Sequence, residues 1–82
     1  MKLFVANVSF SASEEDLREL FSAVGPIKRL HLAKTVEGKS RGFAFLEFQD
    51  DLDASRALDD LHGHNFQGRR LVVQEASDGG QR

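Results

Sequence analysis

Residues 41–48, RGFAFLEF, carry two phenylalanines that cannot share a strand face with the apolar residues that follow them. Side chains of a β-strand alternate between its two faces, so Phe43 and Phe45 lie opposite Leu46 and Phe48. A chain of 82 residues forms one domain and buries only about 60% of the surface that it exposes when unfolded. We therefore expect this strand to bury one face in a compact core and to leave two aromatic rings on the other.

The rest of the chain divides into short strands and helices. Apolar residues recur at strand spacing in four segments and at helical spacing in two. In chain order we expect a strand at 3–8, a helix at 13–24, strands at 27–34 and 41–48, a helix at 50–61 and a strand at 70–75. Ser13 and Asp16 predict a capping box for the first helix, and Asp50 or Asp51 caps the second.

This order predicts an α+β fold of the ferredoxin-like split βαβ type (βαββαβ), in which a four-stranded antiparallel sheet has two helices packed on one face. The other face stays open. Alternation places Phe4 on the open face with Phe43 and Phe45, and it turns Arg29, His31 and Ala33 outward on the second strand. We expect one domain over 1–76, followed by a short flexible tail at 77–82.

Two segments resemble the signature motifs of the RNA recognition motif family. Residues 41–48 fit the octapeptide K/R-G-F/Y-G/A-F-V-x-F/Y, with Leu46 at the Val position. Residues 3–8, LFVANV, fit the hexapeptide apolar-aromatic-apolar-x-Asn-apolar. The resemblance covers residues 2–76 and extends to the small stand-alone, single-domain RNA-binding members of the family. The sequence departs from the family at His62-Gly63, where Asn-Gly is common, and we expect this to affect the turn.

The resemblance implies that the first and third strands are neighbours, which brings the three open-face phenylalanines together. Aromatic rings hold unpaired bases by stacking, at about 1–3 kcal/mol per base. The family resemblance also implies that Arg41 contacts a phosphate group of the RNA. We expect phosphate contacts from further cations and base-edge hydrogen bonds from two polar side chains. The predicted RNA-binding residues are Phe4, Phe43, Phe45, Arg41, Lys2, Arg29, Lys39, His31 and Gln74.

The charge distribution permits a polyanionic ligand although the net charge is −2. The two predicted helices hold nine acidic and two basic residues, a net charge of −7. The other segments up to Ala76 sum to +5. A molecule with this asymmetry can attract phosphates on one side while remaining acidic overall.

Other functions and sites find less support in the sequence. The same scaffold hosts small hydrolases such as acylphosphatases, but residues 8–12 lack the Gly and Arg of a phosphate-binding loop, and we expect no enzyme. His62 and His64 lack partners for a metal site, and we expect no cofactor. Phe21 and Phe48 belong to the core by their spacing, and Phe10 and Phe66 are expected to pack at the domain edge.

The alternatives that stay open are a protein-interaction domain of the same fold and a general binder of single strands, single-stranded DNA included. The chain has no cysteine and no apolar run near the roughly 20 residues of a membrane span, and we expect no secretory signal. We expect a monomer in the cytoplasm that does not contact a membrane; an organellar or nuclear location stays open.

Overall fold

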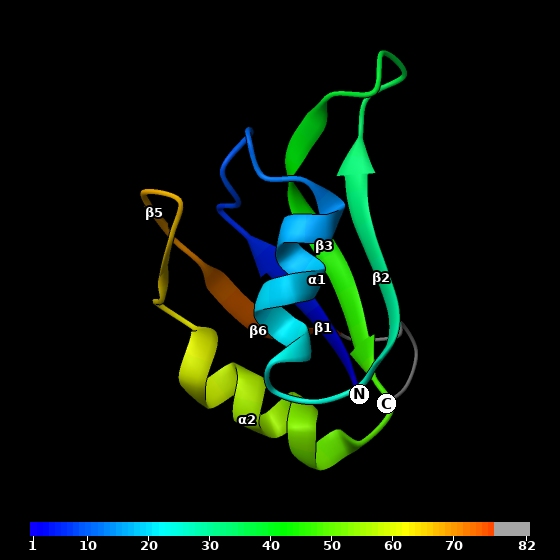
Figure 1. The fold of residues 1–82 in the computed structure, drawn as a ribbon, viewed down its shortest axis with the longest axis vertical. Coiled ribbons are helices and arrows are strands. Elements are labelled where there is room, and N and C mark those ends of the chain that lie inside the picture. Colours follow the sequence, from blue (N-terminus) through cyan, green and yellow to red (C-terminus); the bar gives the residue numbers. More distant parts are fainter. Residues whose placement is uncertain (77–82) are drawn as a thin grey trace.

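The main strands and helices follow one another in the predicted order (Figure 1). The computed structural model describes residues 1–76 and contains β1 (Lys2–Ala6), α1 (Glu14–Ser22), β2 (Ile27–Lys34), β3 (Ser40–Phe48), α2 (Asp51–Leu61), β4 (Asn65–Phe66), β5 (Arg69–Arg70) and β6 (Val72–Ala76). The four long strands form one antiparallel sheet in the order β2-β3-β1-β6. Both helices cover the same face, so the ferredoxin-like split βαβ fold is confirmed. The predicted tail at 77–82 lies outside the described residues.

A small hairpin corrects the predicted last strand. A single strand was expected over 70–75, but Arg70 pairs with Asn65 in the two-stranded sheet of β4 and β5. The chain then passes through the buried Leu71 before β6 begins. Gly68, at φ 87°, makes the hairpin turn, and its N–H donates to the Asn65 side chain at 3.2 Å. Arg70 therefore belongs to this hairpin and not to the main sheet.

Both helices begin at side-chain caps, as their sequences predict. Ser13 Oγ accepts from the Asp16 N–H and Asp16 Oδ2 accepts from the Ser13 N–H, each at 3.0 Å, which completes the capping box. Asp50 is the cap of α2 and accepts from the Leu52 N–H at 3.0 Å. Gln67 donates to the Asp16 carboxylate at 3.2 Å, so the start of α1 is also joined to the hairpin.

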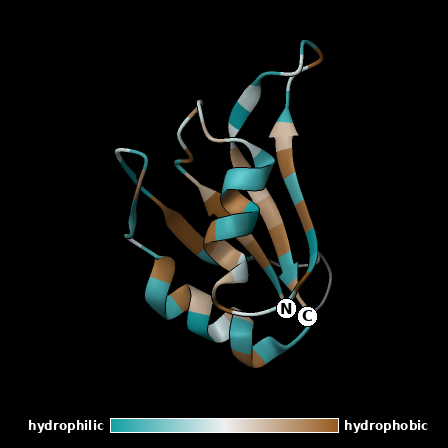
Figure 2. Ribbon diagram, viewed as in Figure 1, coloured by the Kyte–Doolittle hydropathy of each residue, from teal (hydrophilic) through white to brown (hydrophobic). Residues whose placement is uncertain are grey.

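The core fills the space between the sheet and the helices. Figure 2 shows hydrophilic residues over most of the outward surface of both helices, with hydrophobic positions on the strands behind them. The buried side chains of the core come from alternate strand positions and from one side of each helix. They include Leu3, Val5, Leu32, Leu46, Phe48 and Val73 from the sheet and Leu17, Phe21, Ala54, Ala57 and Leu61 from the helices.

The second strand breaks the expected alternation near its end. Ala33 was expected to point outward, but only 8% of it is exposed, and its neighbour Leu32 is buried as well. The register of β2 against β3 shifts between Leu32 and Lys34. An irregularity of this kind adds a residue on one strand and lets two consecutive side chains be buried.

His62 connects the end of α2 to the sheet. Its Nδ1 accepts a hydrogen bond from the Val73 N–H at 3.0 Å, and the next residue, Gly63, donates its N–H to the Leu71 carbonyl at 2.7 Å. Gly63 has φ 84°, which a residue with a side chain adopts at a cost. The His-Gly pair thus fixes where β6 begins. Within residues 1–76, neither helix is long and apolar enough to cross a membrane.

We predict that Asp16→Ala destabilises the fold in a pH-dependent manner. Hydrogen bonds from the Ser13 backbone N–H and then from the Gln67 amide lower the pKa of Asp16. A carboxylate with a lowered pKa contributes stability above its ordinary pKa of about 3.9, and this contribution is lost as the pH falls through the folded-state value. Urea unfolding should show a difference from wild type at about pH 7 that shrinks at about pH 2.5. A difference that is the same at both pH values would contradict this role.

Candidate nucleic-acid interface

Three phenylalanine rings lie together on the sheet face that neither helix covers. Their centroids are 5.4 Å apart for Phe4 and Phe45, 5.7 Å for Phe4 and Phe43, and 6.2 Å for Phe43 and Phe45. Phe45 is 38% exposed, and the other two rings are half-buried, partly by one another. Alternation in β1 and β3 puts them here, because Leu3, Val5, Leu46 and Phe48 occupy the opposite face. We call this three-ring cluster the aromatic platform.

Strand register arranges the predicted site residues around the platform in two rows that cross the sheet. Each row consists of residues that pair directly across neighbouring strands. The first row, from β2 through β3 and β1 to β6, is His31, Phe45, Phe4 and Gln74. The second row is Arg29, Glu47, Lys2 and Ala76. Six of the nine predicted residues therefore lie in these two rows: four in the first row, and Arg29 and Lys2 in the second.

Arg41 lies beside the third ring. Its guanidinium carbon is 5.2 Å from the centroid of the Phe43 ring, a cation–π distance, and the residue is exposed. The contact holds a positive charge at the edge of the platform. Lys39 is placed differently, in the exposed turn between β2 and β3, where its backbone pairs with Thr35. The structure thus brings Arg41 to the rings and leaves Lys39 outside the two rows.

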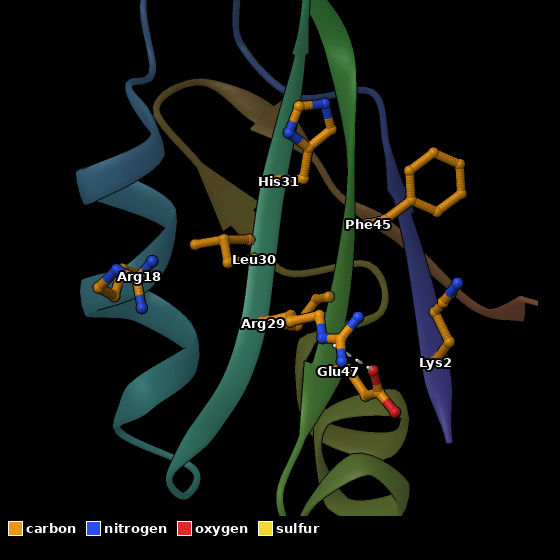
Figure 3. Close-up of a pocket in the computed structure, with 8 residues that line it drawn as sticks. Lys2, Arg18, Arg29, Leu30, His31, Phe45 and Glu47 are labelled. Atoms are coloured by element: carbon orange, nitrogen blue, oxygen red, sulfur yellow. Dashed lines mark ion pairs between the residues drawn. The ribbon is translucent and has the colours of Figure 1, made fainter.

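Glu47 is a charged residue of this face that is not among the predicted site residues. Its Oε1 lies 3.9 Å from Arg29 Nε, and the side chains are 26% and 75% exposed, respectively. Figure 3 shows this pair near Phe45 and Lys2. These four residues line part of a hollow of about 480 Å³. Strand alternation alone predicts that Glu47 lies on the open face. Its position between Arg29 and Lys2 depends on how β3 pairs with β2 and β1.

Phe10 and Arg69 form a second exposed contact between a cation and a ring. The prediction that Phe10 packs at the domain edge is wrong for most of its ring, which is 66% exposed. The Arg69 guanidinium carbon is 5.9 Å from its centroid, and Asn7 Oδ1 accepts from Arg69 Nε at 3.1 Å and Nη2 at 2.8 Å. Phe10 lies in a loop, where no alternation indicates which way a side chain points.

Residues 3–72 match the family model for the RNA recognition motif (RRM). The chain belongs to the RNA recognition motif family. This RRM domain is 42% identical over 77 residues, 94% of its length, to multiple RNA-binding domain-containing protein 1 of Saccharomyces cerevisiae. It is 41% identical over 76 residues, 92% of its length, to cleavage stimulation factor subunit 2 of Bos taurus. It spans only 9% and 13%, respectively, of these two relatives.

Solved structures of RRM domains have the same fold. The crystal structure of RNA binding protein PG1 superimposes with a TM-score of 0.90 at 38% identity and covers 99% of both chains. The RRM of Rna15 with bound RNA (GU) has a TM-score of 0.88 at 28% identity, over 94% of this chain and 83% of that one. Within residues 1–76 of the present RRM, no three His, Cys, Asp or Glu side chains are grouped so that they could hold a metal ion.

We predict that Gly42→Ala destabilises this RRM by about 1–2 kcal/mol, the cost of a left-handed conformation for a residue with a side chain. Gly42 has φ 84°, and its carbonyl accepts from the Val8 N–H at 2.9 Å. A methyl group there would lie 3.2 Å from Phe10 Cε1, and this exposed ring can move aside. Urea unfolding measures the loss.

The matched control is Gly38→Ala, at φ 87° with open space around the added methyl group. The Gly38→Ala variant has the same backbone strain but no contact with the Phe10 ring. We expect a similar loss of stability in both variants and altered NMR shifts of the Phe10 ring only in Gly42→Ala. A loss well below 0.5 kcal/mol for Gly42→Ala would contradict the importance of its backbone conformation.

Proposed function

We propose that this RRM domain binds single-stranded RNA, without catalysing a reaction, by stacking two or three bases on the aromatic platform. The observation that carries the proposal is the cluster of Phe4, Phe43 and Phe45, with centroids 5.4–6.2 Å apart, on the uncovered sheet face. Grouped apolar side chains on a surface mark binding sites. Every base has a π face that can stack on such rings. Duplex bases are already stacked on one another, so an unpaired strand is the expected ligand.

Cations around the platform are proposed to contact phosphates. Arg41, held over Phe43, is the principal one, because a guanidinium at the edge of the rings can donate to a phosphate while its neighbour stacks on a base. Lys2 and Arg29 of the second row and Lys39 of the turn add electrostatic attraction. The acidic helices lie on the opposite face and favour approach of RNA to the platform.

The first row ends in polar side chains that are proposed to contact base edges. His31 and Gln74 flank the paired rings of Phe45 and Phe4, and both are exposed. A base stacked on either ring brings its edge within reach of these neighbours. Nothing in the two rows is a dedicated reader of the 2′-hydroxyl group, so we propose that single-stranded DNA competes with RNA for the platform. The cytoplasmic location and the monomeric state stay predictions.

A protein-interaction domain of the same fold is the second candidate. The observation that favours it is Leu52, which is 70% exposed at the start of α2 between Asp51 and Asp53. A single exposed leucine is common on protein surfaces, whereas the platform groups three rings. Backbone NMR shifts on titration with a random-sequence oligonucleotide separate the two candidates: shifts in β1 and β3 support RNA binding, and their absence supports a protein ligand.

We predict that Phe43→Ala weakens binding of a single-stranded oligonucleotide by about 1–3 kcal/mol, the contribution of one stacked base. The ring is half-buried at the surface and lies outside the core, so stability should change little. Fluorescence anisotropy of a labelled octanucleotide measures the affinity. Affinity equal to that of wild type would refute the platform.

The matched control for this variant is Phe48→Ala, which removes the same side chain from the other face of β3. Phe48 is 3% exposed and belongs to the core. Its truncation should cost about 3–5 kcal/mol of folding stability, measured by urea unfolding. The pair separates a ring used for binding from a ring used for packing.

We predict a shallow dependence of RNA affinity on salt. Arg41, Lys2 and Arg29 are the cations nearest the platform, and Arg29 shares its charge with Glu47. If about one to three phosphates are neutralised, log K should fall with log salt concentration at a slope between about −0.7 and −2. Anisotropy titrations from low to moderate salt measure it. A slope much steeper than −2 would indicate a larger phosphate-binding surface than these residues provide.

A further inference from the structure

A carboxylate is unexpected on the open sheet face, because RNA, the proposed ligand of this face, is a polyanion. Among the residues of the two rows, Glu47 alone carries a carboxylate, and it lies between Arg29 on β2 and Lys2 on β1. Its side chain is 26% exposed, so it is partly withdrawn from solvent among its neighbours. A negative charge here repels phosphates. It can, however, accept hydrogen bonds from a base whose ring lies on the platform.

The geometry leaves this carboxylate able to accept such bonds. The distance of 3.9 Å from Arg29 Nε to Glu47 Oε1 is an ion-pair distance, longer than a hydrogen bond. A carboxylate has about four lone-pair sites on its two oxygens. The guanidinium of Arg29 is 75% exposed and has five N–H donors. Acceptor and donor therefore stand side by side, both open to a ligand.

The platform supplies the surface that would hold a base next to this pair. Phe45 precedes Glu47 by two residues on the same face of β3, a separation of roughly 7 Å along the strand. Phe45, Glu47, Arg29 and Lys2 line part of the hollow of about 480 Å³, which also extends to Arg18 of α1. Figure 3 shows Arg29 and Glu47 at one end of this group and the Phe45 ring beyond them.

The order of donors and acceptors selects among the four bases. Guanine presents two adjacent donors, N1–H and N2–H₂, which match two carboxylate oxygens, and next to them the acceptor O6, which matches a cation. Adenine and cytosine present one amino group toward a carboxylate. Uracil presents one N–H between two carbonyl groups, which a carboxylate repels. Guanine is therefore the base whose Watson–Crick edge fits a carboxylate flanked by cations.

We propose that Glu47 and Arg29 form a guanine-selective subsite beside Phe45, with the guanine N1–H and N2–H₂ donating to Glu47 and O6 accepting from Arg29. Lys2, on the other side of Glu47, adds positive charge near the same base. The subsite rests on the proposed binding of single-stranded RNA and adds a base preference to it.

The test compares uridine heptamers with a single guanosine placed at each position in turn. Wild-type protein should bind the best-placed guanosine heptamer about five- to 150-fold more tightly than the plain uridine heptamer. Inosine, which is guanine without the N2 amino group, should lose roughly three- to tenfold of that gain. In Glu47→Gln, one acceptor becomes a donor, so guanosine and inosine should bind alike. Plain uridine should bind this variant more tightly than wild type, because a negative charge has left the face.

The matched control is Glu37→Gln, which removes the same charge from the exposed turn between β2 and β3 and should keep the wild-type preference. NMR spectra of both variants verify that the fold is retained. Uridine binding with no guanosine preference in wild type, or an unchanged ratio of guanosine to inosine affinity in Glu47→Gln, would overturn the subsite alone. Failure of wild type to bind any heptamer would overturn the proposed function and the subsite with it.

Discussion

The alternation of side chains along β3 is the constraint on which the molecule depends. β3 lies between β2 and β1, and the helices cover only one face of the sheet. The strand therefore places Leu46 and Phe48 in the core and Phe43 and Phe45 on the open face. A slip of one residue would exchange these sets, burying a glutamate and exposing core side chains. The same register of β3 is therefore needed both to pack the core and to expose the two phenylalanine rings.

Features that depend on local periodicity could be predicted from the sequence. The four main strands, both helices, the caps at Ser13 and Asp50, and the face of Phe4, Phe43 and Phe45 all follow from spacing within about ten residues. The hairpin of β4 and β5 could not, because two-residue strands have no measurable period. The burial of Ala33 depends on a register irregularity, and the exposure of Phe10 on a loop, so neither leaves a periodic signal.

The candidate site likewise has features that could be predicted from the sequence and features that could not. Membership of the open face follows from parity within each strand, and this is why the three rings and Arg29, His31 and Gln74 could be named from sequence. Which residues meet across strands is a property of register between segments far apart in the chain. Glu47 illustrates the difference: its face was predictable, whereas its place between Arg29 and Lys2 required the pairing of β3 with both neighbours.

The pairing of β1 with β6 has a consequence for how the chain acquires its structure. Residues 2–6, which are translated before all other strands of this sheet, pair with residues 72–76 on one side and with β3 on the other. Until the segment of β6 emerges, one edge of β1 has no strand beside it, and the nascent polypeptide cannot complete its sheet. Contacts of such long sequence separation slow folding, because loop closure must precede the gain from pairing. Completion of the sheet around β1 therefore waits for β6, the last of its four strands in chain order.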